Sequence, residues 1–145
     1  MKKLLFLLAV LLGFNSIAQN TYLHCGKIID TNNGKVLTDK TIVVSGNKIV
    51  SVNDGFIDKS SADDIIVDLK NKTVMPGFID MHVHIEGETS PTRYLDVFTK
   101  NEADIAFNAA EIAKRTLLSG FTTVRDLGGS GVNVALRNAI AQGKL

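Results

Sequence analysis

The chain has 145 residues, of which 45% are hydrophobic, 6% aromatic and 21% charged. Its 16 Lys and Arg residues balance 15 Asp and Glu residues, a charge that gives no sign of a nucleic-acid or acidic-membrane partner. The one cysteine, Cys25, excludes an internal disulfide, and we expect it to be a small buried hydrophobe in a strand.

Residues 1–18 are interpreted as a signal peptide. Lys2 and Lys3 precede an apolar run over residues 4–14, and small or polar residues then end at Ala18. Cleavage after Ala18 leaves about 127 residues, enough for one ordinary core. An uncleaved membrane anchor is the alternative, although the run is shorter than the roughly 18 to 20 residues that span a bilayer. We therefore expect a periplasmic or secreted protein with no membrane attachment after cleavage.

Residues 19–75 predict a small β-sandwich. Short runs rich in Val and Ile are separated by Asn, Asp and Gly residues, a pattern typical of antiparallel hairpins. A last hairpin is expected at residues 70–72, with the chain returning through residues 73–75. His24 is expected to be an ordinary strand residue. The runs cover residues 22–29, 41–45, 48–52 and 65–69.

After Pro76 the pattern changes. Residues 78–85 predict a strand, and residues 102–119 predict a helix, because apolar residues recur at helical spacing and Gly120 follows as a stop. Residues 121–126 predict a second strand and residues 134–141 a second helix. This alternation of strands and helices, joined by Gly-rich loops, is typical of the parallel β/α units of an α/β protein.

His82 and His84 are the candidate metal ligands. Two residues apart on a predicted strand, they project from one face with Cβ atoms roughly 6 to 7 Å apart, close enough to bind one divalent ion. Met81, Val83 and Ile85 then point toward packing helices. Taken alone, the pattern also fits two polar residues on a half-exposed strand.

Three features together carry a resemblance to a known family. They are the opening β-rich segment, residues 74–84 (Val-Met-Pro-Gly-Phe-Ile-Asp-Met-His-Val-His) and residues 119–126 (Ser-Gly-Phe-Thr-Thr-Val-Arg-Asp). The chain resembles the start of the metal-dependent amidohydrolases, in their imidazolonepropionase-like and Xaa-Pro dipeptidase-like branch. The resemblance implies a β-sandwich beside a TIM-type (β/α)8 barrel, of which residues 76–145 supply only the first two β/α units.

The resemblance also implies one or two divalent ions, commonly zinc, bound by His82, His84 and ligands from later strands. The metal activates water to hydrolyse a C–N bond in a small-molecule amide, cyclic amide or dipeptide. The further metal ligands and the catalytic aspartate belong to strands after Leu145, so no catalytic residue is assigned. We interpret the chain as the N-terminal portion of a longer enzyme, a truncated gene model or a natural fragment, inactive by itself.

Four other residues are weaker candidates for the site. Asp80 shares the face of His82 and either supports a ligand histidine or is a structural carboxylate. Arg125 and Asp126 end the second strand, where polar residues can face the site. We favour a structural role, in which they pair with each other or cap the following loop. Arg93 and Tyr94 lie in a long segment, residues 87–100, on the expected substrate side, where a plain surface loop is an equal alternative.

The sequence leaves other functions open. The chain is alternatively a non-catalytic β-rich binding module or one half of a split enzyme. Parallel strands with open edges argue against a self-sufficient module. The sequence does not determine the substrate, the number of metal ions or the oligomeric state, and the intact protein could be a homo-oligomer. The metal is also open, because two imidazoles suit zinc, nickel, cobalt or iron alike.

Overall fold

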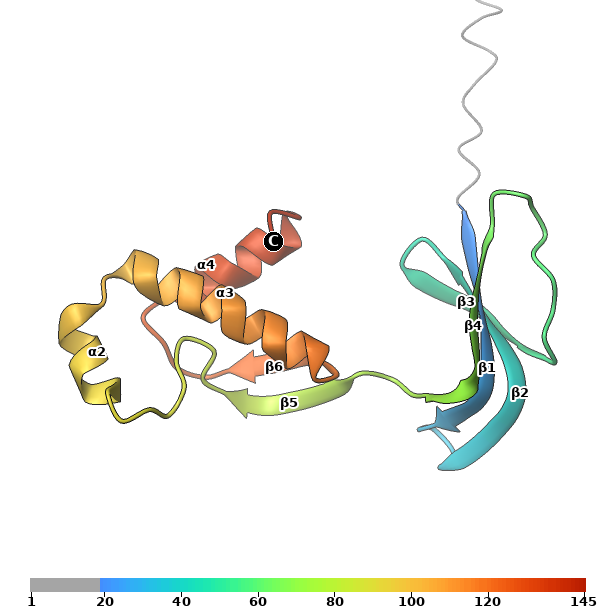
Figure 1. Ribbon diagram of the computed structural model, residues 1–145, viewed down its shortest axis with the longest axis horizontal. Helices are drawn as coiled ribbons and strands as arrows, with labels where there is room; N and C mark the ends of the chain where they lie inside the picture. Colours follow the sequence, from blue (N-terminus) through green and yellow to red (C-terminus); the bar gives the residue numbers. More distant parts are fainter. Residues whose placement is uncertain (1–18) are drawn as a thin grey trace, which may run out of the picture. The chain divides into compact units, whose positions relative to one another are not determined.

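A computed structural model describes residues 19–145 (Figure 1). The expected signal peptide therefore lies outside the described residues. The chain divides into two compact units, a first that ends at Pro76 and a second that spans Gly77–Leu145. Within the described part, no helix has the length and apolar character needed to cross a membrane.

The first unit is built on a four-stranded sheet. Its strands are β1 (Asn20–Asp30), β2 (Lys35–Ser45), β3 (Lys48–Asp54) and β4 (Ile65–Val74), arranged in the order β3-β2-β1-β4. The β1–β2 and β2–β3 pairs are antiparallel, as the Gly-containing turns predict, whereas β4 runs parallel to β1. In the described residues, the β-rich unit expected as a sandwich is this one mixed sheet.

The hairpin predicted at residues 70–72 is wrong, because β4 continues through them. The strand pairs with β1 from Thr21 opposite Ile65 to Ile28 opposite Val74. Between Cys25 and Lys27 of β1 the register shifts, and the partner strand advances from Leu69 to Thr73. The polar tripeptide therefore forms an irregularity in a continuous strand, a β-bulge, instead of a turn.

Gly26 permits this irregular pairing. A Cβ atom at Gly26 would lie 1.8 Å from the carbonyl oxygen of Lys70, closer than any side chain tolerates. The core lies beside this point, where Cys25 and Ile28 of β1 pack with Ile42 of β2. Cys25 is fully buried, and burial raises the pKa of its thiol, as befits an inert core residue.

Buried polar side chains join the segment between β3 and β4 to β1. The carboxylate of Asp64 is buried and accepts hydrogen bonds from the backbone N–H of Asn20 at 2.9 Å, the hydroxyl of Ser60 and the backbone N–H of Ser61, both at 3.0 Å. His24 is also buried, and its Nε2 lies 2.9 Å from the carbonyl oxygen of Ile57. His24 thus serves the fold, as the sequence predicts.

The second unit contains the predicted β/α alternation. Strands β5 (Phe78–Val83) and β6 (Phe121–Asp126) pair in parallel, α3 (Glu102–Leu118) connects them, and α4 (Val132–Ala141) follows β6. The α/β class, a β-rich unit followed by β/α units, is therefore confirmed. The expectation of a loop over residues 87–100 is wrong for α2 (Arg93–Thr99), a short helix that begins after Pro91 in a stretch free of Gly and Pro.

Helix α3 has well-defined ends. Its N-terminus is a capping box, in which the Asn101 side chain accepts from the backbone N–H groups of Ala103 and Asp104, and Asp104 accepts from the N–H of Asn101. Gly120, with φ of 97°, ends the helix and leads directly into β6. Buried Ala109 and Ile112 hold the helix against the sheet, so the crossover fixes β6 beside β5.

Replacing Gly26 by Ala is expected to destabilise the first unit by about 3 kcal/mol, because the new methyl group overlaps the Lys70 carbonyl and the β1–β4 ladder must shift. Urea unfolding combined with hydrogen exchange of the β1 and β4 amides measures the loss. Gly87→Ala is the control, since a Cβ there has no atom within 4 Å. Equal stability of the two variants would contradict the close approach.

Asp64 is expected to make the first unit sensitive to acid. Hydrogen bonds, first from the Asn20 N–H and then from Ser60 and Ser61, hold the pKa of Asp64 below its ordinary value. A lowered folded-state pKa stabilises the fold fully above the unfolded value of about 3.9 and loses that contribution as the pH falls through the folded value.

The urea midpoint of the first unit should therefore fall on acidification, and Asp64→Asn should lower it at neutral pH and flatten its acid dependence. Asp58→Asn, at an exposed carboxylate, is the control. If Asp64→Asn leaves the acid dependence of the urea midpoint unchanged, other carboxylates are responsible for that dependence.

Candidate metal site at the ends of two parallel strands

The two candidate ligands come together at the end of β5. His82 lies in the strand and His84 directly after it, and both side chains are exposed. Their ring centroids are 5.3 Å apart, with the rings edge to face. On the other face, Val83 is half-buried and Ile85 is buried, as expected of positions under a helix, whereas Met81 is 57% exposed.

This spacing fits a shared metal ion. Two imidazoles on one tetrahedral zinc ion, with Zn–N bonds of about 2.0 to 2.1 Å, have ring centres about 5 Å apart. Among residues 19–145, no group of three or more His, Cys, Asp and Glu side chains gathers in a metal-binding arrangement. The pair therefore accounts for two ligands of a tetrahedral ion, and its metal-binding role stays a prediction.

Glu86 connects the end of β5 to the loop after β6. Its Oε2 accepts the backbone N–H of Ser130 at 2.8 Å, and its Oε1 accepts that of Asn133 at 2.9 Å. The N-cap of α4 is Gly131, whose φ of 107° suits glycine and which offers no side-chain oxygen. Glu86 therefore provides the carboxylate that the N-terminus of this helix favours.

The bonds to Glu86 also set its charge state. Partial burial raises the pKa of Glu86, and the nearby Asp126 charge raises it further. Hydrogen bonds from Ser130 and Asn133 lower the pKa by more, so its final value lies below that of an ordinary glutamate. The group is a carboxylate at neutral pH. Sequence reasoning missed this role, although the absence of a side-chain cap at Gly131 was a usable signal.

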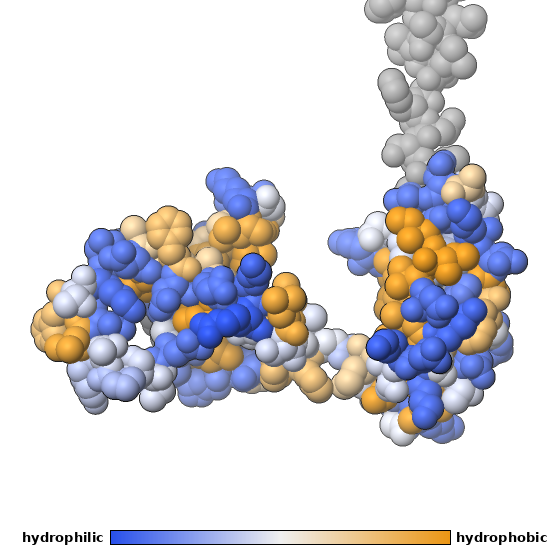
Figure 2. All heavy atoms as spheres, in the orientation of Figure 1, coloured by the Kyte–Doolittle hydropathy of each residue, from blue (hydrophilic) through white to orange (hydrophobic). Residues whose placement is uncertain are grey.

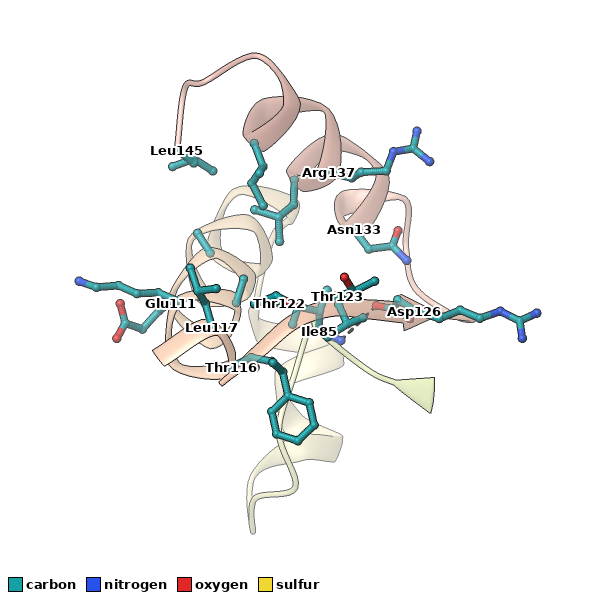
Figure 3. A pocket seen from close by; sticks show the side chains of 18 of the residues that line it. Ile85, Glu111, Thr116, Leu117, Thr122, Thr123, Asp126, Asn133, Arg137 and Leu145 are labelled. Atoms are coloured by element: carbon teal, nitrogen blue, oxygen red, sulfur yellow. Dashed lines mark hydrogen bonds between the residues drawn. The ribbon is translucent and has the colours of Figure 1, made fainter. Parts of the chain in front are cut away.

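Asp126 makes the matching connection from the end of β6. Its Oδ2 accepts the backbone N–H of Ile85 at 3.1 Å, and its Oδ1 accepts that of Gly128, also at 3.1 Å. Figure 3 shows Asp126 beside Ile85, with Asn133 at the start of α4 above them. Asp126 therefore caps the loop that follows its own strand, one of the structural roles that the sequence suggests.

The remaining candidate residues lie on three elements, β5, β6 and α2. Asp80 is half-buried, and its Oδ1 accepts the backbone N–H of His82 at 3.0 Å, so it orders the strand next to the first histidine. Arg125 is exposed on β6. Arg93 and Tyr94 begin α2, where Tyr94 is 88% exposed. The structure thus unites the histidines and leaves the proposed substrate contacts at the surface.

A separate cavity of about 900 Å³ lies between α3, α4 and β6 (Figure 3). Aliphatic side chains such as Leu117, Val134 and Ile140 dominate its lining, and neither histidine contributes to it. Helices of β/α units pack on sheets through surfaces of this kind. We therefore assign the cavity to packing and place the candidate chemistry at the strand ends.

Comparisons with known proteins agree with this arrangement. Residues 73–144 match the amidohydrolase family. A solved Xaa-Pro dipeptidase, crystallised with methionine in its active site, is 38% identical with a TM-score of 0.79 over 88% of this chain. The chain belongs to the amidohydrolase superfamily. The enzymes of this superfamily are generally metal-dependent, and their catalytic domains are TIM barrels.

Two further amidohydrolases show the breadth of the similarity. A solved prolidase complexed with N-methylphosphonate-L-proline is 32% identical, with a TM-score of 0.74. The imidazolonepropionase of Picrophilus torridus is 37% identical over 65 residues, or 43% of this chain. The resemblance to Xaa-Pro dipeptidase-like and imidazolonepropionase-like amidohydrolases expected from the sequence is thus confirmed.

The chain spans only part of these relatives. It covers 31% of the dipeptidase, 30% of the prolidase and 15% of the imidazolonepropionase. It corresponds to their N-terminal portion.

Proposed function

We propose that the chain is the N-terminal portion of an exported metal-dependent hydrolase that cleaves C–N bonds in amides, cyclic amides or dipeptides. The observation that carries this proposal is the pair of imidazoles, with centroids 5.3 Å apart, at the end of a parallel strand in an amidohydrolase chain. Export rests on the pattern of residues 1–18 and places the protein in the periplasm or outside the cell.

His82 and His84 are the residues of this chain that would hold the metal, for which we propose zinc. A bound zinc ion supplies a Lewis acid and lowers the pKa of bound water toward neutrality. The task of the chain is to hold two neutral imidazoles on one side of that ion. Both rings are exposed and therefore accessible to it.

The nearby carboxylates are already committed to other partners. Each oxygen of Glu86 and each oxygen of Asp126 accepts a backbone N–H. A general base must exchange a proton with water or substrate, so neither carboxylate is suited to that role in this arrangement. We infer that the catalytic base and the remaining ligands come from outside this chain, which by itself is inactive.

The relatives favour a dipeptide as the substrate. The Xaa-Pro dipeptidase and the prolidase both match 88% of this chain, at 38% and 32% identity. The 5-methylthioadenosine/S-adenosylhomocysteine deaminase of Bacillus anthracis is 28% identical over 46% of it. We therefore propose a dipeptide first and a cyclic amide second.

The 145-residue chain is expected to bind zinc weakly, with a dissociation constant in the micromolar range or higher, because two histidines leave half of a tetrahedral ion to water. Calorimetric titration at neutral pH measures this, and His82→Ala should remove the binding. His24→Gln is the matched control, since it deletes a histidine of the first unit and keeps an N–H donor for the Ile57 carbonyl. Submicromolar affinity, or binding that survives His82→Ala, would contradict the proposed site.

The activity itself is tested on the longest open reading frame that contains this sequence. We expect a product with bound metal that hydrolyses Xaa-Pro dipeptides, and His84→Ala should reduce both metal content and kcat/KM by at least about 100-fold. Elemental analysis and amino-acid release measure the two effects. A folded product with neither metal nor hydrolytic activity would refute the proposed function.

A further inference from the structure

The segments that follow β5 and β6 exchange hydrogen bonds in both directions. Glu86, after β5, accepts two backbone N–H groups from the β6 side, those of Ser130 and Asn133. Asp126, at the end of β6, accepts the N–H of Ile85 on the β5 side. We call these five residues the carboxylate clasp: Ile85, Glu86, Asp126, Ser130 and Asn133.

Gly129 lets the loop after β6 lie directly against Glu86, and its neighbour Gly128 lies beside His84. A Cβ at Gly129 would be 2.5 Å from Oε1 of Glu86, so a side chain there would push the carboxylate away. A Cβ at Gly128 would lie 4.0 Å from Cε1 and Nδ1 of His84, an ordinary contact distance. The loop therefore passes beside both the carboxylate and the imidazole.

The two histidines are held by different means. His82 lies inside β5, and its backbone N–H is also bonded to Asp80. His84 comes after the last residue of β5, beyond the strand ladder. The backbone N–H of the next residue, Ile85, and the side chain of Glu86 are bonded to the β6 side. The orientation of His84 thus depends on the clasp more than that of His82 does.

We propose that Glu86 is a positioning residue for His84, which it holds by locking the loop after β6 against the end of β5. This inference rests on the proposed metal site and adds a support that acts on one of its two ligands. Glu86 needs no contact with metal or substrate for this role. Its effect on metal binding passes through the backbone and the His84 ring.

Glu86→Gln in the 145-residue chain tests the proposal. Only one end of a Gln amide accepts hydrogen bonds, so one of the two N–H groups loses its acceptor. Hydrogen exchange of the Ser130 and Asn133 amides should become at least about tenfold faster. In a zinc titration followed by the imidazole resonances, affinity should fall about tenfold, with the change concentrated at His84.

Glu88→Gln is the matched control. Glu88 is in the same segment, and its carboxylate pairs with Arg115 at 2.8 Å, outside the clasp. This variant should leave amide exchange in the loop and zinc affinity unchanged.

The readouts separate this proposal from the proposed function. Faster exchange at Ser130 and Asn133 with unchanged His84 resonances and zinc affinity would overturn the positioning role and leave the metal site intact. A parent chain that binds no zinc would count against the metal site, and the His84 resonances alone would then decide the positioning role. If Glu86→Gln unfolds the second unit, Glu86→Asp, which keeps the charge, is measured in the same way.

Discussion

The parallel pairing of β5 with β6 runs from Phe78 opposite Phe121 to Val83 opposite Asp126, and it brings the carboxyl ends of both strands to one edge. The histidines follow one strand end and the glycine-rich loop follows the other, so their contact depends on this register. Gly77 allows the approach where the strands begin, since a Cβ there would lie 2.2 Å from Cγ2 of Thr122. A larger residue at position 77 would separate the strands and, with them, the residues at their far ends.

The two units show different kinds of packing. In the first, β1 lies between β2 and β4 and buries Cys25, Thr41 of β2 and other residues almost completely. The second has few buried side chains, Ile85, Ala109 and Ile112 among its hydrophobic ones, while Ile79 and Phe107 are well exposed. Figure 2 shows such hydrophobic side chains at the surface of each unit. A two-stranded sheet with one flanking helix pair buries little apolar area, so the second unit is expected to contribute less stability than the first.

Local patterns in the sequence were enough to predict much of the second unit. The expected bounds of β6 match the structure, and α3 differs by one residue, because Gly120 and the apolar spacing are strong local signals. The β4 bulge was missed because it depends on a partner strand distant in sequence. The bonds of Glu86 to Ser130 and Asn133, and the bond of Asp126 to Ile85, were missed for the same reason: they join residues 41 to 47 positions apart, so no short-range pattern shows which groups are partners.

Glu86 also changes what the start of α4 can recognise. A helix N-terminus with free N–H groups attracts phosphate or carboxylate ligands. Here the N–H of Asn133 is already bonded to a protein carboxylate, and Asp126 adds a second negative charge nearby. The protein's own carboxylate therefore takes the position that an anionic ligand would occupy at a free helix N-terminus, and the charge of Asp126 further disfavours an anion at this corner.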